Sequence, residues 1–301
     1  MFTIKVPATT ANIGPGFDSI GIALNLFNEI TVEKSDSKIF DWGNTGITLS
    51  KEKNLILTAL EYTMDKFNIS SGYHIVSEQM DIPISRGLGS SAASIVLGVY
   101  AAFFLMDFKF EKDKILEIAT ELEGHPDNVA PAIFGNLISS ALLENSVIYS
   151  KTYIPNEIVF NVLIPDFKLS TEKARSVLPS SYSKEDCIFN ISRVALLISA
   201  LNNNEISIIK YALKDRIHQP YRLDLIENGQ NIFEYLDSIK SLGYYISGAG
   251  PTLISLDKTN TAEKNKKLIK NHLDKYKTNW LVKTLEVCKD GVELKNISEK
   301  Q

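Results

Sequence analysis

Cysteine is scarce in this sequence. The 301 residues contain two, Cys187 and Cys288, and their spacing fits neither a metal site nor a disulfide framework. This excludes the class of small extracellular domains that depend on disulfides, and it favours a reducing compartment. Residues 1–7 also lack the basic-then-apolar layout of a signal peptide. We therefore predict a cytoplasmic protein.

The sequence also lacks an excess of positive charge and a long apolar segment. The net charge of −4 at pH 7 argues against nucleic acid and anionic membranes as partners, because both attract basic surfaces. The uncharged stretch at 92–106 has about 15 residues, whereas a membrane span needs roughly 20. It predicts a buried helix in a protein with no membrane and no nucleic-acid partner.

The length allows one large domain or two ordinary ones. Strand-like and helix-like stretches alternate without the regular period of a Rossmann sheet, which predicts an α+β fold with two domains. A strand-like stretch at 157–165 is expected to open the second half. Residues 7–18 are predicted to form an irregular loop because they are rich in glycine and proline, and residues 218–222 a short polar turn. The polar C-terminal end is predicted to be disordered.

Residues 83–94, PISRGLGSSAAS, are typical of a glycine loop that feeds directly into a helix. Glycine lets the backbone approach a ligand closely, and a helix N-terminus offers free N–H groups with a partial positive charge. Ser90 and Ser91 add hydroxyls for a phosphate oxygen or Mg²⁺. No lysine follows the glycines, so this is not a Walker loop. The stretch predicts a phosphate site held mostly by backbone dipoles, with a plain serine-capped helix as the alternative.

Other polar residues form three candidate groups: Asn12 with Asp18; Glu121, Glu123, His125, Asp127 and Asn128 at the end of a predicted helix; and Arg175 with Arg222. A carboxylate at a helix end suits Mg²⁺, whereas zinc would need a second His or Cys at ligand spacing. Arginine's planar fork suits a carboxylate or a phosphate. Each group taken alone also fits turn chemistry, a solvated helix end or a surface ion pair. A glycine turn between two strands is predicted at 247–252.

Together these motifs resemble those of the GHMP kinase family. The loop at 83–94 is similar to that family's phosphate loop. The segments PATTANIGPGFD at 7–18 and EGHPDNVAPAIFG at 123–135 are similar to those of the branch that phosphorylates homoserine. With the glycine turn at 247–252, four motifs in order carry the likeness, so it covers most of the chain.

The resemblance implies an α+β fold of two domains with the active site between them. Residues 1–153 would form an ATP-binding domain like domain 2 of ribosomal protein S5, and residues 154–301 a ferredoxin-like domain. The implied reaction is ATP-dependent phosphorylation of the side-chain hydroxyl of L-homoserine to O-phospho-L-homoserine, in threonine biosynthesis, with ATP and Mg²⁺ as cofactors. A GHMP kinase for another small alcohol and a non-catalytic ATP-binding sensor are the alternatives. The oligomeric state stays open, with a homodimer as one option.

The resemblance also implies roles for individual residues. The ATP phosphates are expected at Pro83, Ile84, Ser85, Arg86, Gly87, Leu88, Gly89, Ser90, Ser91, Ala92 and Ala93, and the adenine at Asn54. Mg²⁺ is expected at Ser91 and Glu123. Homoserine is expected at Asn12, Asp18, His125, Asn128, Thr171, Arg175 and Arg222, with Thr252 close by. Chemistry agrees, because a zwitterion needs a carboxylate for its ammonium and guanidinium groups for its carboxylate.

The catalytic position implied by the resemblance is Asn128. Several relatives carry an aspartate there, but an amide cannot accept a proton. We expect Asn128 to orient the hydroxyl while the γ-phosphate takes its proton, since phosphoryl transfer depends mostly on positioning and charge stabilisation. Asp127 is the competing base, and His125 follows it.

Two positions depart from the family's pattern. The segment before His125 is short, so Glu121 could take the place of Glu123 at the metal. Asn136 stands where the family usually has the second of two glycines. Asparagine tolerates positive φ at some cost, so the turn is expected to persist.

Overall fold

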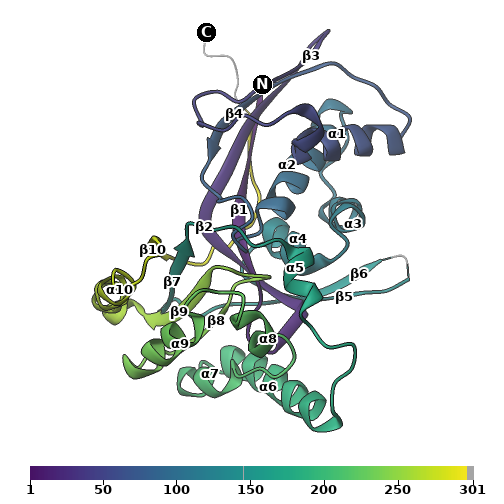
Figure 1. The fold of residues 1–301 in the computed structure, drawn as a ribbon. Helices are drawn as coiled ribbons and strands as arrows, with labels where there is room; N and C mark the ends of the chain where they lie inside the picture. The colour runs from purple at the N-terminus through teal and green to yellow at the C-terminus, as the bar shows by residue number, and fades with distance from the viewer. Residues whose placement is uncertain (145, 297–301) are drawn as a thin grey trace.

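The computed structural model describes residues 1–144 and 146–296. Two β-sheets form its framework, and helices from different parts of the chain pack around them (Figure 1). This confirms the predicted α+β class. In the described part of the chain, every helix is too short or too polar to span a membrane.

The first sheet is organised around two long antiparallel strands. Its strands are β1 (Phe2–Asn12), β2 (Gly16–Lys34), β3 (Lys38–Asp41), β4 (Tyr73–Met80), β5 (Leu137–Leu142), β6 (Val147–Thr152) and β11 (Glu293–Asn296). The prediction of an irregular loop at 7–18 is wrong, because β1 extends to Asn12 and β2 begins at Gly16. A register shift between Pro7 and Ala8 accommodates the proline, which cannot donate to a regular ladder.

Four helices cover one side of this sheet (Figure 1). They are α1 (Leu55–Lys66), α2 (Ser90–Leu105), α3 (Lys112–Glu123) and α4 (Pro126–Phe134), preceded by the short 3₁₀ helix η1 (Lys51–Lys53). Helices α2 and α4 pack on β1 and β2, and α1 and α3 pack on those helices. The uncharged stretch forms α2 and is buried almost throughout, as predicted.

The second sheet has the order β10-β7-β9-β8. Its strands are β7 (Ile158–Pro165), β8 (Gly243–Ile246), β9 (Leu253–Lys258) and β10 (Trp280–Leu285), and its helices are α5 (Thr171–Ser176), α6 (Lys184–Asn202), α7 (Ile206–Ala212), α8 (Gln219–Leu223), α9 (Gly229–Ser238) and α10 (Thr259–Leu273). The glycine turn predicted at 247–252 does join two strands. The polar turn predicted at 218–222 is instead helix α8, because Pro220 lies in the first helical turn, where its missing N–H is not needed.

The last described strand returns to the first sheet. β11 pairs antiparallel with β1, from Phe2 opposite Asn296 to Lys5 opposite Glu293. The domain boundary predicted at 153/154 assigns residues 293–296 to the second domain, whereas β11 belongs to the first sheet. The C-terminal end predicted to be disordered therefore contains a strand, and its last part, residues 297–301, lies outside the described residues.

Candidate active site

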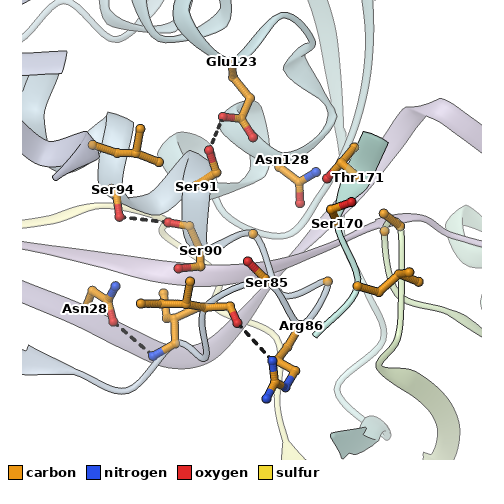
Figure 2. Close-up of a pocket in the computed structure, with 18 of the residues that line it drawn as sticks. Asn28, Ser85, Arg86, Ser90, Ser91, Ser94, Glu123, Asn128, Ser170 and Thr171 are labelled. Carbon is orange, nitrogen blue, oxygen red and sulfur yellow. Dashed lines mark hydrogen bonds between the residues drawn. The ribbon is translucent and has the colours of Figure 1, made fainter. Parts of the chain in front are cut away.

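A cleft of about 330 Å³ lies where the first sheet's helices meet the second sheet's turns. Figure 2 labels Glu123, Asn128, Ser170 and Thr171 among the residues that line it; Ser170 is the N-cap of α5, and Thr171 is its first residue. Apolar side chains also line it: Trp42, Ile47, Leu49, Met80, Ile82 and Ile84. An apolar wall beside convergent polar groups suits a ligand with both a planar apolar part and charged parts.

The glycine loop enters α2 through two residues with positive φ. Gly87 has φ +75° and Gly89, the N-cap of α2, has φ +67°. A Cβ on Gly89 would lie 1.9 Å from Thr9 Oγ1, and one on Gly87 2.4 Å from the carbonyl oxygen of Ser247. Only glycine fits at either position, so the loop can pass between β1 and the 247–252 turn and leave the N-terminus of α2 facing the cleft.

The residues predicted for the phosphates divide into two sets. Those that line the cleft are Ile84, Ser85, Arg86, Gly87, Gly89, Ser90 and Ser91, whereas Leu88, Ala92 and Ala93 are buried in the core and Pro83 lies outside the lining. The Arg86 guanidinium donates to the carbonyl oxygens of Pro165 (2.9 Å) and Asp166 (2.7 Å). Arg86 thus ties the loop to the second sheet through its side chain.

Glu123 and Ser91 meet at the N-terminus of α2 (Figure 2). Ser91 Oγ donates to Glu123 Oε2 at 2.7 Å, and burial raises the pKa of Glu123. Glu121 lies outside the cleft, because it accepts hydrogen bonds from Tyr62 Oη (2.5 Å) and Lys66 Nζ (2.6 Å). One carboxylate and one hydroxyl beside the N-terminus of α2 fit Mg²⁺, which usually takes one or two protein carboxylates together with water and phosphate oxygens. Within residues 1–144 and 146–296 no cluster of three or more His, Cys, Asp or Glu forms a closed metal site.

A chain of hydrogen bonds links four residues next to this pair. His125 Nδ1 lies 2.6 Å from Asp127 Oδ1, and Asn128 Nδ2 donates to the same oxygen at 3.2 Å. Thr9 Oγ1 donates to Asn128 Oδ1 at 2.7 Å. The hydrogen bond to Asp127 raises the pKa of His125. Asp127 is 2% exposed, and one of its oxygens already serves two donors, which makes it a poorer base than the sequence suggests.

Asp18 and Arg175 form a bidentate ion pair at the mouth of the cleft. Both N–O distances are 2.9 Å, and both side chains remain partly exposed. Asn12 holds Asp18 in place, because its Oδ1 accepts from the Asp18 N–H at 2.9 Å while its Nδ2 donates to Gly248 O. Asn12 and Asp18 both have positive φ (67° and 52°), which is uncommon outside glycine and marks a position fixed by its surroundings.

Arg222 is buried beside this pair, at 1% exposure. It donates to the carbonyl oxygens of Ala174 (3.2 Å) and Gly248 (3.0 Å). Burial lowers the pKa of Arg222 to about 10, so the group stays charged at neutral pH. Among the residues that the structure describes, no carboxylate lies within ion-pair distance of it. A buried cation that lines the cleft without a counter-ion favours binding of an anion.

Sequence reasoning missed the residues that support these arginines. The Phe17 ring lies under both guanidinium groups, with centroid distances of 5.6 Å to Arg175 and 5.0 Å to Arg222. It also stacks on His218 at 5.3 Å. Phe17 immediately precedes Asp18, so proximity to a predicted site residue was the one available signal.

Of three further predicted residues, Asn54 has a second role, Thr171 lies in the cleft as predicted, and Thr252 lies behind it. Asn54 lines the cleft, but its Oδ1 caps α1 by accepting from the N–H groups of Ile56 and Leu57. Thr171 lines the cleft at the first position of α5. Thr252 is fully buried behind the lining, and its Oγ1 has no hydrogen-bond partner among the described residues.

His218 is expected to make the free energy of unfolding depend on pH. Its Nε2 donates to Gly14 O at 2.7 Å, and Nδ1 faces Arg222 Nη1 at 3.4 Å. Burial lowers the pKa of His218, an effect that the carboxylate of Asp215 at 3.7 Å opposes without overcoming. The unfolded chain therefore binds this proton first, so the free energy of unfolding should fall as the pH drops from about 7.5 to about 5.5. Urea unfolding measured across that range should show that the free energy of unfolding changes less with pH in His218→Gln than in the wild type. The same pH dependence in both proteins would contradict the assignment.

The turn at Asn136 persists, as expected. Asn136 has φ 57° and donates through Nδ2 to Lys289 O at 3.0 Å. This contact joins the end of α4 to the segment that leads into β11.

A family model and nearly full-length relatives place this chain in the same family. Residues 54–136 match the family described as GHMP kinases N terminal domain. The homoserine kinase of Clostridium botulinum (strain Okra / Type B1) is 44% identical over 297 residues, covering 98% of this chain and 99% of that protein. The homoserine kinase of Clostridium novyi (strain NT) is 43% identical over 298 residues, with 98% and 99% covered.

Solved structures extend the likeness to the whole fold. The crystal structure of homoserine kinase from Cytophaga hutchinsonii aligns with a TM-score of 0.87 at 27% identity, covering 97% of this chain and 96% of that one. The mevalonate diphosphate decarboxylase of Enterococcus faecalis aligns with a TM-score of 0.72 at 14% identity, with 98% and 99% covered. The second comparison shows a shared fold alone, since one fold can host several activities.

Proposed function

Because the chain belongs to the homoserine kinases of the GHMP kinase family, we propose that it transfers the γ-phosphoryl group of ATP to the side-chain hydroxyl of L-homoserine. The product is O-phospho-L-homoserine, on the route to threonine. The scarcity of cysteine supports a cytoplasmic location.

The observation that carries the choice of substrate is the charge arrangement at the cleft mouth. Arg222 is a buried cation without a carboxylate at ion-pair distance among the described residues, and the Asp18–Arg175 pair lies beside it. We infer that the substrate carboxylate binds the two guanidinium groups while its ammonium group binds Asp18. A sugar or a hydroxy acid without an ammonium group would leave Asp18 without a matching charge.

The phosphate end of the cleft suits ATP. The N-terminus of α2 and the glycine loop present backbone N–H groups to the phosphates. Ser91 and Glu123 would hold Mg²⁺, which when bound would neutralise negative charge on the phosphate oxygens. The apolar side chains that line the cleft would contact the adenine.

Positioning accounts for most of the chemistry in this proposal. Asn128 orients the homoserine hydroxyl, whose oxygen attacks the γ-phosphorus as the bond to the β–γ bridging oxygen breaks and ADP leaves. The hydroxyl proton passes to an oxygen of the transferred phosphoryl group, because Asn128 cannot take it. Asp127 stays as the partner of His125 and Asn128 rather than as the base.

The direct test measures ADP release from Mg-ATP with L-homoserine, mevalonate, phosphomevalonate and galactose supplied separately. Turnover with homoserine alone, with O-phosphohomoserine identified by ³¹P NMR, is the expected result. Turnover only with another acceptor would contradict the roles given to Asp18 and Arg222. ATP binding without turnover on any acceptor would favour a sensor.

A further inference from the structure

Thr9 lies at the junction of the two halves of the cleft. Its side chain is fully buried, and its backbone N–H donates to Leu88 O of the glycine loop at 3.2 Å. Its hydroxyl donates to Asn128 Oδ1 at 2.7 Å. Gly89 leaves room for this hydroxyl, since a Cβ there would lie 1.9 Å from Thr9 Oγ1. One residue of β1 thus contacts both the loop at the phosphates and the amide at the acceptor.

Asp127 and Thr9 fix the orientation of the Asn128 side-chain amide. Asp127 Oδ1 accepts from Asn128 Nδ2 at 3.2 Å, and a carboxylate oxygen can only accept. The reversed amide would place its carbonyl oxygen against that carboxylate oxygen. With the nitrogen on the side of Asp127, the carbonyl oxygen lies on the side of Thr9 and accepts from the hydroxyl.

We propose that Thr9 is a positioning residue for phosphoryl transfer, acting by occupying the carbonyl oxygen of Asn128. This inference rests on the proposed function. With Oδ1 engaged by Thr9, Asn128 meets the homoserine hydroxyl through an N–H donor. The hydroxyl oxygen is then held while its own hydrogen is not bound by the amide, and that hydrogen is free to pass to the γ-phosphoryl group.

Thr9→Val tests this directly, because valine keeps the shape of threonine and removes the donor. We expect kcat with homoserine to fall about 10- to 100-fold, as for other residues that orient a group in direct contact with substrate. The KM values for homoserine and ATP should change less than about 3-fold, because the groups proposed to bind them are unaltered. Thr9→Ser restores the hydroxyl and should recover kcat to within about 3-fold of the wild type.

Thr63→Val is the matched control. Thr63 in α1 is also fully buried, and its hydroxyl donates to Ala59 O at 2.7 Å, outside the cleft lining. Thermal unfolding should show both valine variants destabilised, whereas only Thr9→Val should lose kcat. A similar loss of kcat in both variants would overturn the proposal.

Combination with Asn128→Ala tells whether Thr9 acts through Asn128. Thr9→Val should lower the kcat of Asn128→Ala by less than about 2-fold, since the group it orients is already gone. A full additional loss would mean that Thr9 acts through the glycine loop and would overturn the proposal, as would unchanged kcat in Thr9→Val alone or a 10-fold loss in Thr9→Ser. Wild-type protein that leaves homoserine unphosphorylated would instead refute the proposed function, and this inference with it.

Discussion

Glu123→Gln is expected to lower the kcat of homoserine phosphorylation by about 10²- to 10³-fold, the usual effect of removing one group that stabilises transition-state charge. Glutamine keeps the size and the hydrogen bond from Ser91 but removes the carboxylate charge. The half-saturating Mg²⁺ concentration should rise as well. Initial rates measured across a Mg²⁺ titration would report both quantities.

Glu121→Gln is the control for that experiment. Glu121 lies two residues away on α3, but its carboxylate is held by Tyr62 and Lys66 on the surface. We expect its kcat and Mg²⁺ dependence to match those of the wild type. If Glu121→Gln loses activity and Glu123→Gln keeps it, the metal position given to Glu123 is wrong.

Asp18→Asn is expected to lower kcat/KM for homoserine by about 10²- to 10³-fold, because the substrate ammonium group loses its ionic partner. Most of the loss should appear in KM, since the ammonium group keeps its charge throughout the reaction. The residual activity should also discriminate less between homoserine and 4-hydroxybutyrate, which lacks the ammonium group.

The comparison of the two substrates gives this prediction its specificity. A variant that had merely lost structure would lose activity toward both, whereas Asp18→Asn should lose it toward homoserine alone. Asp107→Asn removes an exposed ion pair with Lys34 outside the cleft and should leave both activities unchanged. A wild-type preference for homoserine that persists in Asp18→Asn would assign the ammonium group to another residue.

The sequence predicted those parts of the fold that depend only on residues close together in the chain. The buried helix α2 follows from an uncharged stretch, and the entry to it follows from two glycines and two serines. The loop predicted at 7–18 failed because glycine and proline are compatible with a strand when a register shift accommodates them. Helix α8 was missed because a proline in a short polar segment is typical of a turn, although it also fits the first turn of a helix.

The sequence predicted individual residues of the candidate site, but not which of them meet in space. Asp18, Arg175 and Arg222 come from distant segments, and the structure brings them to one cleft mouth. Phe17 and Thr9 could not be found from composition or spacing, because their partners lie far away in the sequence, whereas His218 stands four positions before the predicted Arg222. Thr9 and Asn128, for example, are 119 positions apart.

Strand β11 has a consequence for how the molecule forms during synthesis. Residues 2–152 are synthesised long before residues 293–296. The first sheet therefore lacks its last strand until the residues of the second sheet have been made. During that interval β1 has an open edge over Phe2–Lys5, the residues that β11 later covers. Open edges pair with other chains. The N-terminal end of the nascent chain therefore keeps an unpaired strand edge until residues 293–296 have been made.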